Sequence, residues 1–401
     1  MDSKSYSANQ EQFLRLQGQT SPFPFLIEVD YAKGPYIFDK SGRRYTDMIS
    51  GVAVNNIGHN HPKVVDAIQN QLNKHLHVMV YGEFVQDAPL QMAERLTQVL
   101  PEQLNSVYTV NSGTEANEAA IKLAKRVTKR TEIVACFGAY HGSTNGSLSI
   151  SANELKKTAY RPLLPDIRFI RHNQLEDLTA ITEKTAGVII EPVQGDAGVR
   201  VASKEYLIAL RKRCDEVGAL LIYDEIQCGI GRTGKMFAFE HSGVAPDILT
   251  LGKALGGGMP IGALVSDKKN LDLFTHHPML GHITTFGGHP MVCAAAAACL
   301  NVMSTEINFA EIEEKGRWME QQFSKINEIV EIRRIGLMFA IDMVNTERVS
   351  KIVNRCLELG IITFWFLSHP NSFRLSPPLN MTWEELKEAT NLIVKGVEET
   401  K

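Results

Sequence analysis

Short apolar runs alternate with helix-like stretches through the middle of the chain. The runs are rich in Val, Ile and Leu and end in glycine or polar residues, as in the Ala-Leu-Leu-Ile-Tyr that precedes Asp224. Such runs are typical of strands buried on both faces of a parallel sheet. The pattern predicts strands at residues 106–110, 132–137, 167–170, 187–191, 219–224, 247–251 and 261–265. We therefore expect an α/β fold with a mostly parallel seven-stranded sheet between helices.

The pattern differs at the two ends of the chain. Residues 1–35 are polar and contain three prolines, so we expect an arm there, followed by a hairpin at 36–48. After residue 289 come an alanine-rich helix, a charged amphipathic helix, and then shorter strands and helices. We expect the two ends to form a smaller α+β domain. The predicted division is 1–60 for the arm and hairpin, 61–300 for the large domain and 301–401 for the C-terminal part of the small domain.

Composition narrows the possible partners. The chain has 401 residues and a formal net charge of −3, which gives no electrostatic case for nucleic acid or an anionic membrane. The polar first residues lack the apolar segment of a secretion signal, and no apolar run is as long as a membrane span. Six cysteines without a CxxC pair favour the cytoplasm. His59 and His61 have no third ligand nearby in the sequence, so we expect a structural role for them and no metal site.

Asp224 and Lys253 follow two of the predicted strands. Asp224 ends the run at 219–224, and Lys253 follows the run at 247–251 within a glycine-rich segment. Ligands bind beyond the carboxyl ends of strands in such sheets. Each residue alone is more often a solvated surface charge. Together they match pyridoxal phosphate, which a lysine holds as a Schiff base while an aspartate pairs with the pyridine nitrogen.

A candidate phosphate site begins the helix that follows the first strand. Ser112 and Glu115 have the spacing of a capping box, and the start of a helix is a site for anions. Alone, this pattern is an ordinary capped helix, but beside Asp224 and Lys253 a phosphate is the better interpretation. The loop matches neither GxGxxG nor GxxxxGK[ST], which weakens dinucleotide and nucleoside-triphosphate hypotheses.

Three further segments suit this cofactor and its substrates. Tyr140 lies after a strand and has an aromatic ring that can stack on a flat cofactor ring. The segment with Thr284 and Thr285 offers hydroxyl groups among glycines. Arg374 lies in an apolar, proline-rich segment, where a guanidinium suits bidentate binding of a carboxylate, although a structural ion pair is the simpler alternative.

With these residues in place, the chain resembles the class III (ω-amino) aminotransferases of pyridoxal-phosphate fold type I, most closely their ornithine and acetylornithine branch. The resemblance extends over nearly the whole chain, through GPYIFDKSGRRYTD, NSGTEANEAAIKLA, AYHGST, EPVQGDAG, DEIQCGIGRTGK, LGKALGGGMPIGA, TTFGGHP and FRLSPPL. It implies catalytic roles for Lys253 and Asp224, a homodimer, and binding of glutamate or 2-oxoglutarate by Arg374. The residues it places at the cofactor are Ser112, Gly113, Thr114, Tyr140, His141, Glu191, Asp224, Gln227, Lys253, Thr284 and Thr285, with Thr285 reaching the neighbouring subunit. Those it places at the substrate are Arg374, Asp196, Tyr36 and Ser143.

The chain departs from the family pattern at three positions. Asp196 stands where the family has a glutamate that covers the substrate arginine, and His289 replaces an asparagine. Ser143 stands where the ornithine and acetylornithine members carry an arginine for the carboxylate of the donor. We therefore expect ornithine and acetylornithine to be weaker donors, unless a basic residue such as Lys156 or Arg161 substitutes.

The leading hypothesis is a transaminase that passes an amino group from an amino acid or ω-amine to 2-oxoglutarate by a ping-pong mechanism. One alternative keeps the cofactor and the fold but catalyses amine mutation, epimerisation or decarboxylation. Another is a catalytically silent protein that binds a phosphorylated metabolite. Arg374 favours exchange with glutamate, and the presence of both Lys253 and Asp224 argues against a silent protein.

Overall fold

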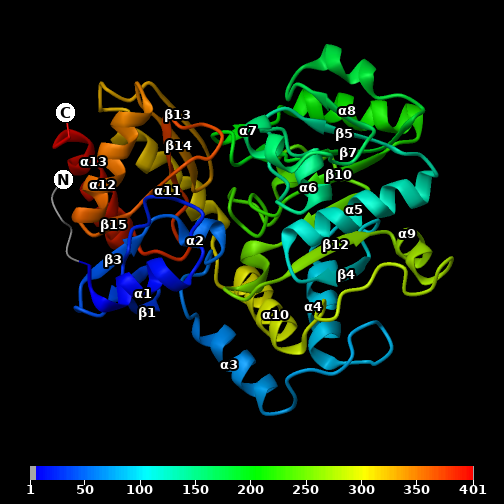
Figure 1. Cartoon of the computed structure of the whole chain (residues 1–401), viewed down its shortest axis with the longest axis horizontal. Helices are drawn as coiled ribbons and strands as arrows, with labels where there is room; N and C mark the ends of the chain where they lie inside the picture. The colour runs from blue at the N-terminus through cyan, green and yellow to red at the C-terminus, as the bar shows by residue number, and fades with distance from the viewer. Residues whose placement is uncertain (1–5, 401) are drawn as a thin grey trace.

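A computed structural model describes residues 6–400 of the chain. Its largest sheet has seven strands and lies on one side of the molecule (Figure 1). The strand order is β4 (Ser106–Val110), β12 (Gly262–Ser266), β11 (Ile248–Leu251), β10 (Leu220–Asp224), β7 (Thr185–Ile190), β5 (Glu132–Cys136) and β6 (Ile167–Ile170). The seven predicted strands are confirmed, each within two residues at either end.

Strand β12 is the one that runs against its neighbours. It pairs antiparallel with both β11 and β4, whereas β11, β10, β7, β5 and β6 run parallel. Only residues 252–261 connect β11 to β12, and they hold a single 3₁₀ turn, Lys253–Gly256. A parallel crossover needs a dozen or more residues, so this short connection allows only the antiparallel arrangement. The turn therefore keeps Lys253 at the end of the sheet.

The sheet is buried on both faces, as the uninterrupted apolar runs predict. Within β10, Ile222 packs in a core cluster with the helix α5 (Gly113–Thr128). Its neighbours Leu221 and Tyr223 belong to the other core cluster, with Leu207 of helix α8 (Lys204–Val217). Successive side chains of a strand point to opposite faces, so α5 and α8 cover opposite sides of the sheet.

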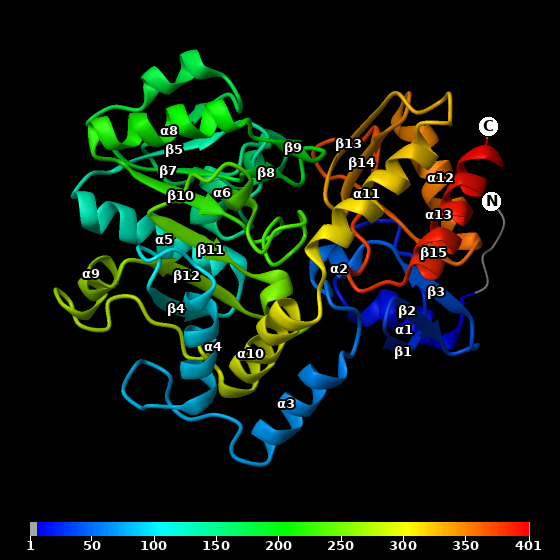
Figure 2. The ribbon, with the colours of Figure 1, turned by 180° about the vertical axis from the view of Figure 1, so that it is seen from behind.

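The two ends of the chain fold together beside the large sheet, and both termini lie on that side (Figures 1 and 2). One sheet joins β1 (Val29–Lys33), β2 (Tyr36–Asp39) and β3 (Arg44–Asp47) to β15 (Ile361–Ile362) from the other end of the chain. A second sheet has the order β13 (Glu331–Ile335), β14 (Met338–Asp342), β17 (Ser372–Leu375) and β16 (Phe364–Trp365). The predicted hairpin at 36–48 is confirmed, while the exact domain boundaries stay a prediction.

The expectation of an arm at residues 1–35 is wrong for the part that the structure describes. Helix α1 (Ala8–Leu16) starts at a capping box between Ser7 and Gln10, and β1 adds a strand to the hairpin. No residue of α1 is buried. The polar composition therefore indicated correctly that this helix contributes little to a core, but the capping residues still start a helix. Residues 1–5 lie outside the described part.

The remaining helices and short strands surround these sheets. They are α2 (Ser50–Ala53), α3 (Pro62–Leu72), α4 (Asp87–Gln98), α6 (Asn145–Ile150), α7 (Glu154–Lys157), α9 (Lys268–Leu271), α10 (Pro290–Thr305), α11 (Phe309–Phe323), α12 (Thr346–Glu358) and α13 (Trp383–Glu398), with β8 (Val193–Gln194) and β9 (Arg200–Val201). Helix α10 packs against α3 and α4. Among the described residues, no single helix has the length and apolarity to cross a membrane; α10 and α11, bent by 78°, pass that test only as a pair.

A buried arginine fixes the loop after β10 to both ends of the chain. The guanidinium of Arg232 donates from Nη1 to the carbonyl oxygens of Leu337, at 3.2 Å, and Pro377, at 2.7 Å. Its Nη2 donates to the side chain of Asn56. Because this loop starts at the end of β10, the contacts set the position of the large sheet relative to the strands of the chain ends.

Candidate active site

A cavity of about 410 Å³ opens where the carboxyl ends of β10 and β11 meet the strands of the chain ends. Its lining combines strand ends, the start of α5 and two loops with residues from the C-terminal part of the chain. The lining residues are Val52, Gly113, Thr114, Tyr140, His141, Gly142, Ser143, Glu191, Asp196, Asp224, Ile226, Gln227, Lys253, Leu367 and Arg374. Eleven of these were predicted from the sequence, and the structure brings them to one place.

Asp224 is the last residue of β10, and its carboxylate is held by three donors. Oδ2 lies 2.8 Å from Nδ2 of Asn117 and 2.7 Å from Nδ1 of His141, and Oδ1 accepts the backbone N–H of Ile226 at 3.0 Å. Asn117 is itself fixed, because its Oδ1 accepts the hydroxyl of Thr250 at 2.8 Å. The buried carboxylate is therefore confined to one orientation at the cavity wall.

His141 lies directly behind this carboxylate. Because a carboxylate only accepts, Nδ1 of His141 carries the proton between them. Burial lowers the pKa of His141, but the hydrogen bond and the charge of Asp224 raise it more, so the net shift is upward. Nε2 is buried without a hydrogen-bond partner among the described residues. This side chain thus orients Asp224.

Lys253 begins the turn after β11 with a strained backbone. Its φ angle of 44° lies in the left-handed region, which costs a residue with a side chain of the order of 1–3 kcal/mol. Burial lowers the pKa of Lys253, while the charges of Asp224 and Glu191 oppose the shift. A lysine with a lowered pKa has more of the neutral amine, which is the nucleophilic form.

The start of α5 faces the cavity as an anion site. Ser112 caps the helix by accepting the backbone N–H of Glu115 at 3.4 Å, so Ser112 acts through the cap and does not line the cavity. Gly113 and Thr114 line the cavity, and the first N–H groups of a helix have no partner within it. Gly142, at a φ of 130°, passes so close that a Cβ there would lie 2.3 Å from Oγ1 of Thr114. The anion site therefore requires glycine at position 142.

Glu191 joins two of the loops that form the cavity. Its carboxylate accepts the backbone N–H of Tyr140 at 3.0 Å and that of Gly195 at 3.1 Å. Burial raises the pKa of Glu191 to about 7, with the charge of His141 acting against the shift. Glu191 thus fixes the backbone next to the Tyr140 ring.

Arg374 reaches the cavity from β17, in the C-terminal part of the chain. Its guanidinium lies 4.4 Å from the centre of the Phe366 ring, and Nε donates to the carbonyl of Trp365 at 3.0 Å. Nη2 lies 3.2 Å from Oδ1 of Asp196. Burial lowers the pKa of Arg374, and Asp196 opposes the shift. Arg374 and Asp196 therefore form a buried ion pair.

Besides Ser112, three other predicted site residues lie outside this cavity. Tyr36 is in β2, where the guanidinium of Arg44 covers its ring at 4.6 Å. Thr284 lines a separate hollow of about 640 Å³ with residues 80–89, and Thr285 is exposed. Within one described chain these side chains do not meet Lys253, so their roles at cofactor or substrate stay predictions.

Sequence reasoning missed Gly142 and four other residues that shape the site. Asn117 was overlooked, although a polar side chain among the alanines on the buried face of α5 is a usable signal. Val52, Ile226 and Leu367 also line the cavity. Val52 has a φ angle of 66°, which is strained for a β-branched residue, and no local pattern in the sequence indicates it.

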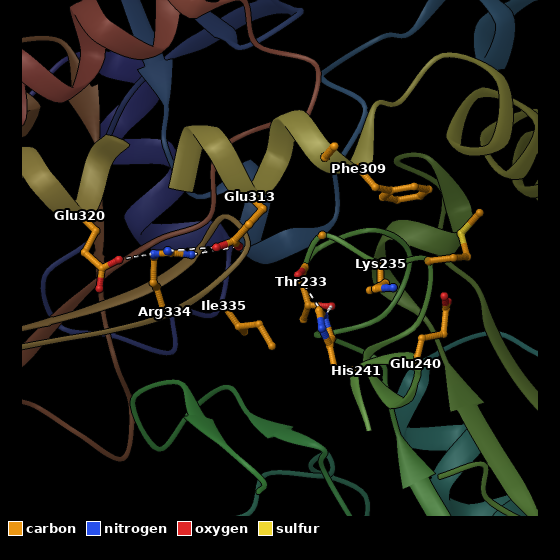
Figure 3. A pocket seen from close by; sticks show the side chains of 12 residues that line it. Thr233, Lys235, Glu240, His241, Phe309, Glu313, Glu320, Arg334 and Ile335 are labelled. Carbon is orange, nitrogen blue, oxygen red and sulfur yellow. Dashed lines mark hydrogen bonds and ion pairs between the residues drawn. The ribbon is translucent and has the colours of Figure 1, made fainter. Parts of the chain in front are cut away.

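A larger hollow, of about 890 Å³, lies between α11 and the loop after β10 (Figure 3). Its arginine already pairs with two glutamates. Arg334 donates to Glu313 at 3.0 Å and to Glu320 at 2.6 Å, and His241 lies 3.1 Å from the hydroxyl of Thr233. Unlike the cavity at Lys253, this hollow has no convergent set of strained and desolvated groups, so we place the chemistry at the smaller cavity.

Comparison with known proteins identifies the family of the chain. The family model for class III aminotransferases matches residues 18–397. The acetylornithine aminotransferase of Methanocaldococcus jannaschii is 39% identical over 373 residues, which are 90% of this chain and 91% of that protein. The one from Clostridium acetobutylicum is 35% identical over 385 residues, 93% of this chain and 97% of that protein.

A solved aminotransferase structure has a similar fold. The structure of the ornithine aminotransferase of Toxoplasma gondii superimposes with a TM-score of 0.90 at 28% identity, covering 98% of this chain and 94% of the other. The predicted α/β fold, with the architecture of fold type I, and the predicted family are thereby confirmed. This chain belongs to the class III aminotransferases.

Proposed function

We propose that the protein transfers an amino group from an amino acid or ω-amine donor to 2-oxoglutarate in two successive half-reactions. The observation that carries this proposal is that Lys253, Asp224 and Arg374 line one cavity of about 410 Å³. The first supplies an amine, the second a fixed carboxylate and the third a guanidinium for a carboxylate substrate.

Pyridoxal phosphate is the cofactor that membership of this family implies, and the residues of the cavity fit it. The start of α5 with Gly113 and Thr114 suits a phosphate, and Tyr140 provides an aromatic wall. Asp224, fixed by His141 and Asn117, suits a protonated ring nitrogen. When bound, the cofactor supplies an electron sink for the carbanion formed at the substrate.

The residues of the chain perform the remaining work. Lys253 would hold the cofactor through Nζ and, once displaced by the donor, move the proton between the substrate carbon and the cofactor. Asp224 holds the proton on the ring nitrogen. Gln227, which lines the same cavity, would donate to the ring oxygen of the cofactor.

Arg374 serves the acceptor half-reaction. A carboxylate of 2-oxoglutarate must take the place of Asp196, which lies 3.2 Å from the guanidinium. When the bound substrate has no carboxylate there, Asp196 covers Arg374 and neutralises its charge. The same cavity can thus accept a donor amine and a dicarboxylic acceptor in turn.

A homodimer is part of this proposal. Large apolar side chains are exposed on two segments, residues 76–85 and residues 279–286, and the second contains Thr284 and Thr285. These side chains are Leu76, Phe84, Val85, Met279, Leu280, Ile283 and Phe286. Val85 and Met279 are 94% and 77% exposed. A monomeric protein rarely exposes so many together. A second copy that covers them would bring Thr285 to its cofactor; light scattering that finds an active monomer would refute this.

A donor screen tests the proposed activity. Purified protein with pyridoxal phosphate and 2-oxoglutarate is offered ornithine, acetylornithine, 4-aminobutyrate and simple ω-amines, and glutamate formation is measured. The names of the two relatives make acetylornithine the first donor to try. Glutamate formation with none of the donors would overturn the proposal. We also propose a cytoplasmic location, which the six unpaired, buried cysteines support.

A further inference from the structure

Lys156 does not line the cavity but approaches two residues that do, at the end of the cavity near Asp196, which we call the outer end. Its Nζ lies 3.5 Å from Oδ2 of Asp196 and 5.3 Å from the centre of the Tyr140 ring. The side chain is 32% exposed, compared with 8% for Arg374 on the other side of Asp196. Lys156 therefore stands between solvent and the substrate space, whereas Arg374 lies deeper.

The two oxygens of Asp196 serve different partners. Oδ1 accepts from Arg374 and from the backbone N–H of Leu367, both at 3.2 Å. Oδ2 accepts from the hydroxyl of Ser368 at 2.8 Å and faces Lys156 at 3.5 Å. One carboxylate thus faces two cations, so these three side chains together carry one positive charge in excess. A substrate carboxylate at this end would compensate it.

The short helix that carries Lys156 is firmly anchored. The next residue, Lys157, is buried and donates to the carbonyl oxygens of Ser149, at 3.1 Å, and Ser151, at 2.9 Å. The capping residue Asn153 donates to the hydroxyl of Ser368 at 3.2 Å, and Ser368 in turn bonds Asp196. The base of Lys156 is thereby held against the cavity, so little order is lost when Lys156 binds a ligand.

The other basic residues of this segment are engaged elsewhere. Arg161 pairs with Glu154 at 2.6 Å, and both side chains are more than half exposed. The amine of Lys157 is taken up by the carbonyl oxygens of Ser149 and Ser151. Among the basic residues at 154–161, Lys156 alone contacts the cavity lining in the described structure.

We propose that Lys156 is a specificity-determining residue that binds a carboxylate at the end of the donor remote from the reacting amine. The inference rests on the proposed function and deepens it, since it names ω-amino carboxylates as the preferred donor class. A carboxylate in this place bonds Nζ of Lys156 beside the hydroxyl of Ser143, which lies 3.3 Å from the hydroxyl of Tyr140. The structure thus assigns the substituting cation that the sequence left open between Lys156 and Arg161.

Paired donors test this assignment. The donor half-reaction is followed without any acceptor, as the change in absorbance of the bound cofactor on mixing. The ω-amino carboxylates 4-aminobutyrate, 5-aminopentanoate and ornithine are compared with n-butylamine and n-pentylamine. In Lys156→Met, the selectivity for carboxylate over neutral donors should fall about 10- to 100-fold, the usual weight of one charge-assisted hydrogen bond. Lys156→Arg should restore most of it, and the matched control Arg161→Gln should keep the selectivity of the natural protein.

Three other outcomes would overturn the proposal. An equal loss with both donor classes makes Lys156 a support of the fold or of Asp196 and overturns the proposal, as does unchanged selectivity. A loss confined to the glutamate half-reaction assigns Lys156 to Arg374 instead and also overturns it. Because no acceptor is present, failure of 2-oxoglutarate as acceptor would refute the proposed function and leave this test intact.

Discussion

At the sheet end of the cavity, the polar side chains bond to one another; at the outer end, Asp196 is shared between two cations. Asp224 is confined by Asn117, His141 and a backbone N–H, all within 3.0 Å. Arg374 and Lys156 lie 3.2 and 3.5 Å from Asp196, distances that a substrate carboxylate can improve on. The sheet end is thus built to hold the reacting groups still, and the outer end to exchange one carboxylate for another.

The largest effect is expected at the sheet end, for Lys253→Ala. Because attachment of the cofactor and movement of the proton both depend on Nζ, turnover should fall by about 10⁴-fold or more. The measurement is glutamate formation, together with borohydride reduction and peptide mapping of the natural protein. Labelling of a lysine other than Lys253 would contradict the assignment.

A somewhat smaller loss is expected for Asp224→Asn. A neutral amide cannot hold the proton on the ring nitrogen, and its NH₂ group must face either the N–H of Ile226 or the donors Asn117 and His141. We expect the rate of the donor half-reaction to fall about 10³-fold while lysine attachment persists. Stopped-flow absorbance with the variant measures both. Near-normal turnover would show that the rigid network does not serve the cofactor.

The outer end should respond in one half-reaction only. Arg374→Ala removes the guanidinium and leaves Asp196 buried without its main cation. The KM for 2-oxoglutarate should rise about 10- to 100-fold, and the half-reaction with a simple ω-amine should change much less. Steady-state kinetics with both substrates varied separates the two. If Arg374→Ala impaired both half-reactions equally, the two ends of the cavity would not have separate roles.

The last prediction concerns the stability of the fold near the sheet end and not the activity. Glu225 follows Asp224 and accepts the N–H groups of Ala238, at 2.6 Å, and Phe239, at 2.7 Å. Burial raises the pKa of Glu225 to about 8, although both N–H groups act against the shift. An exposed glutamate titrates near about 4.3, so between these values the folded state holds a proton that the unfolded state has lost.

Glu225 therefore stabilises the fold fully only at low pH, and this contribution is lost as the pH rises toward about 8. The free energy of unfolding should fall by up to about 1.4 kcal/mol per pH unit in this range, and Glu225→Gln should reduce that slope. Denaturant unfolding at several pH values, followed by circular dichroism, measures it. The exposed Glu314→Gln is the matched control. An unchanged slope in Glu225→Gln would show that Glu225 is ionised in the folded protein.

Local patterns in the sequence were sufficient to place the two reacting residues of the sheet end, Asp224 and Lys253. The apolar runs before Asp224 and Lys253 predicted two strands, and the carboxyl ends of parallel neighbours meet at one edge of a sheet. The cap at Ser112 marked the start of α5 in the same way. The direction of β12 was not predicted, because it depends on the length of a connection and not on the pattern within the strand.

Local patterns in the sequence could not predict which residues meet at the outer end. The sequence identified Arg374, Asp196 and Lys156 as separate candidates, but Arg374 and Asp196 are 178 residues apart and meet only because β17 packs opposite the loop after β7. The choice of Lys156 over Arg161 depends on the different partners that the two side chains meet, Lys156 from α7 and Arg161 from beyond the end of that helix. The sequence by itself determined the strands, the reacting residues at their ends and the family. The tertiary structure decided which cations share Asp196, because contacts between distant segments arise from packing and not from local periodicity.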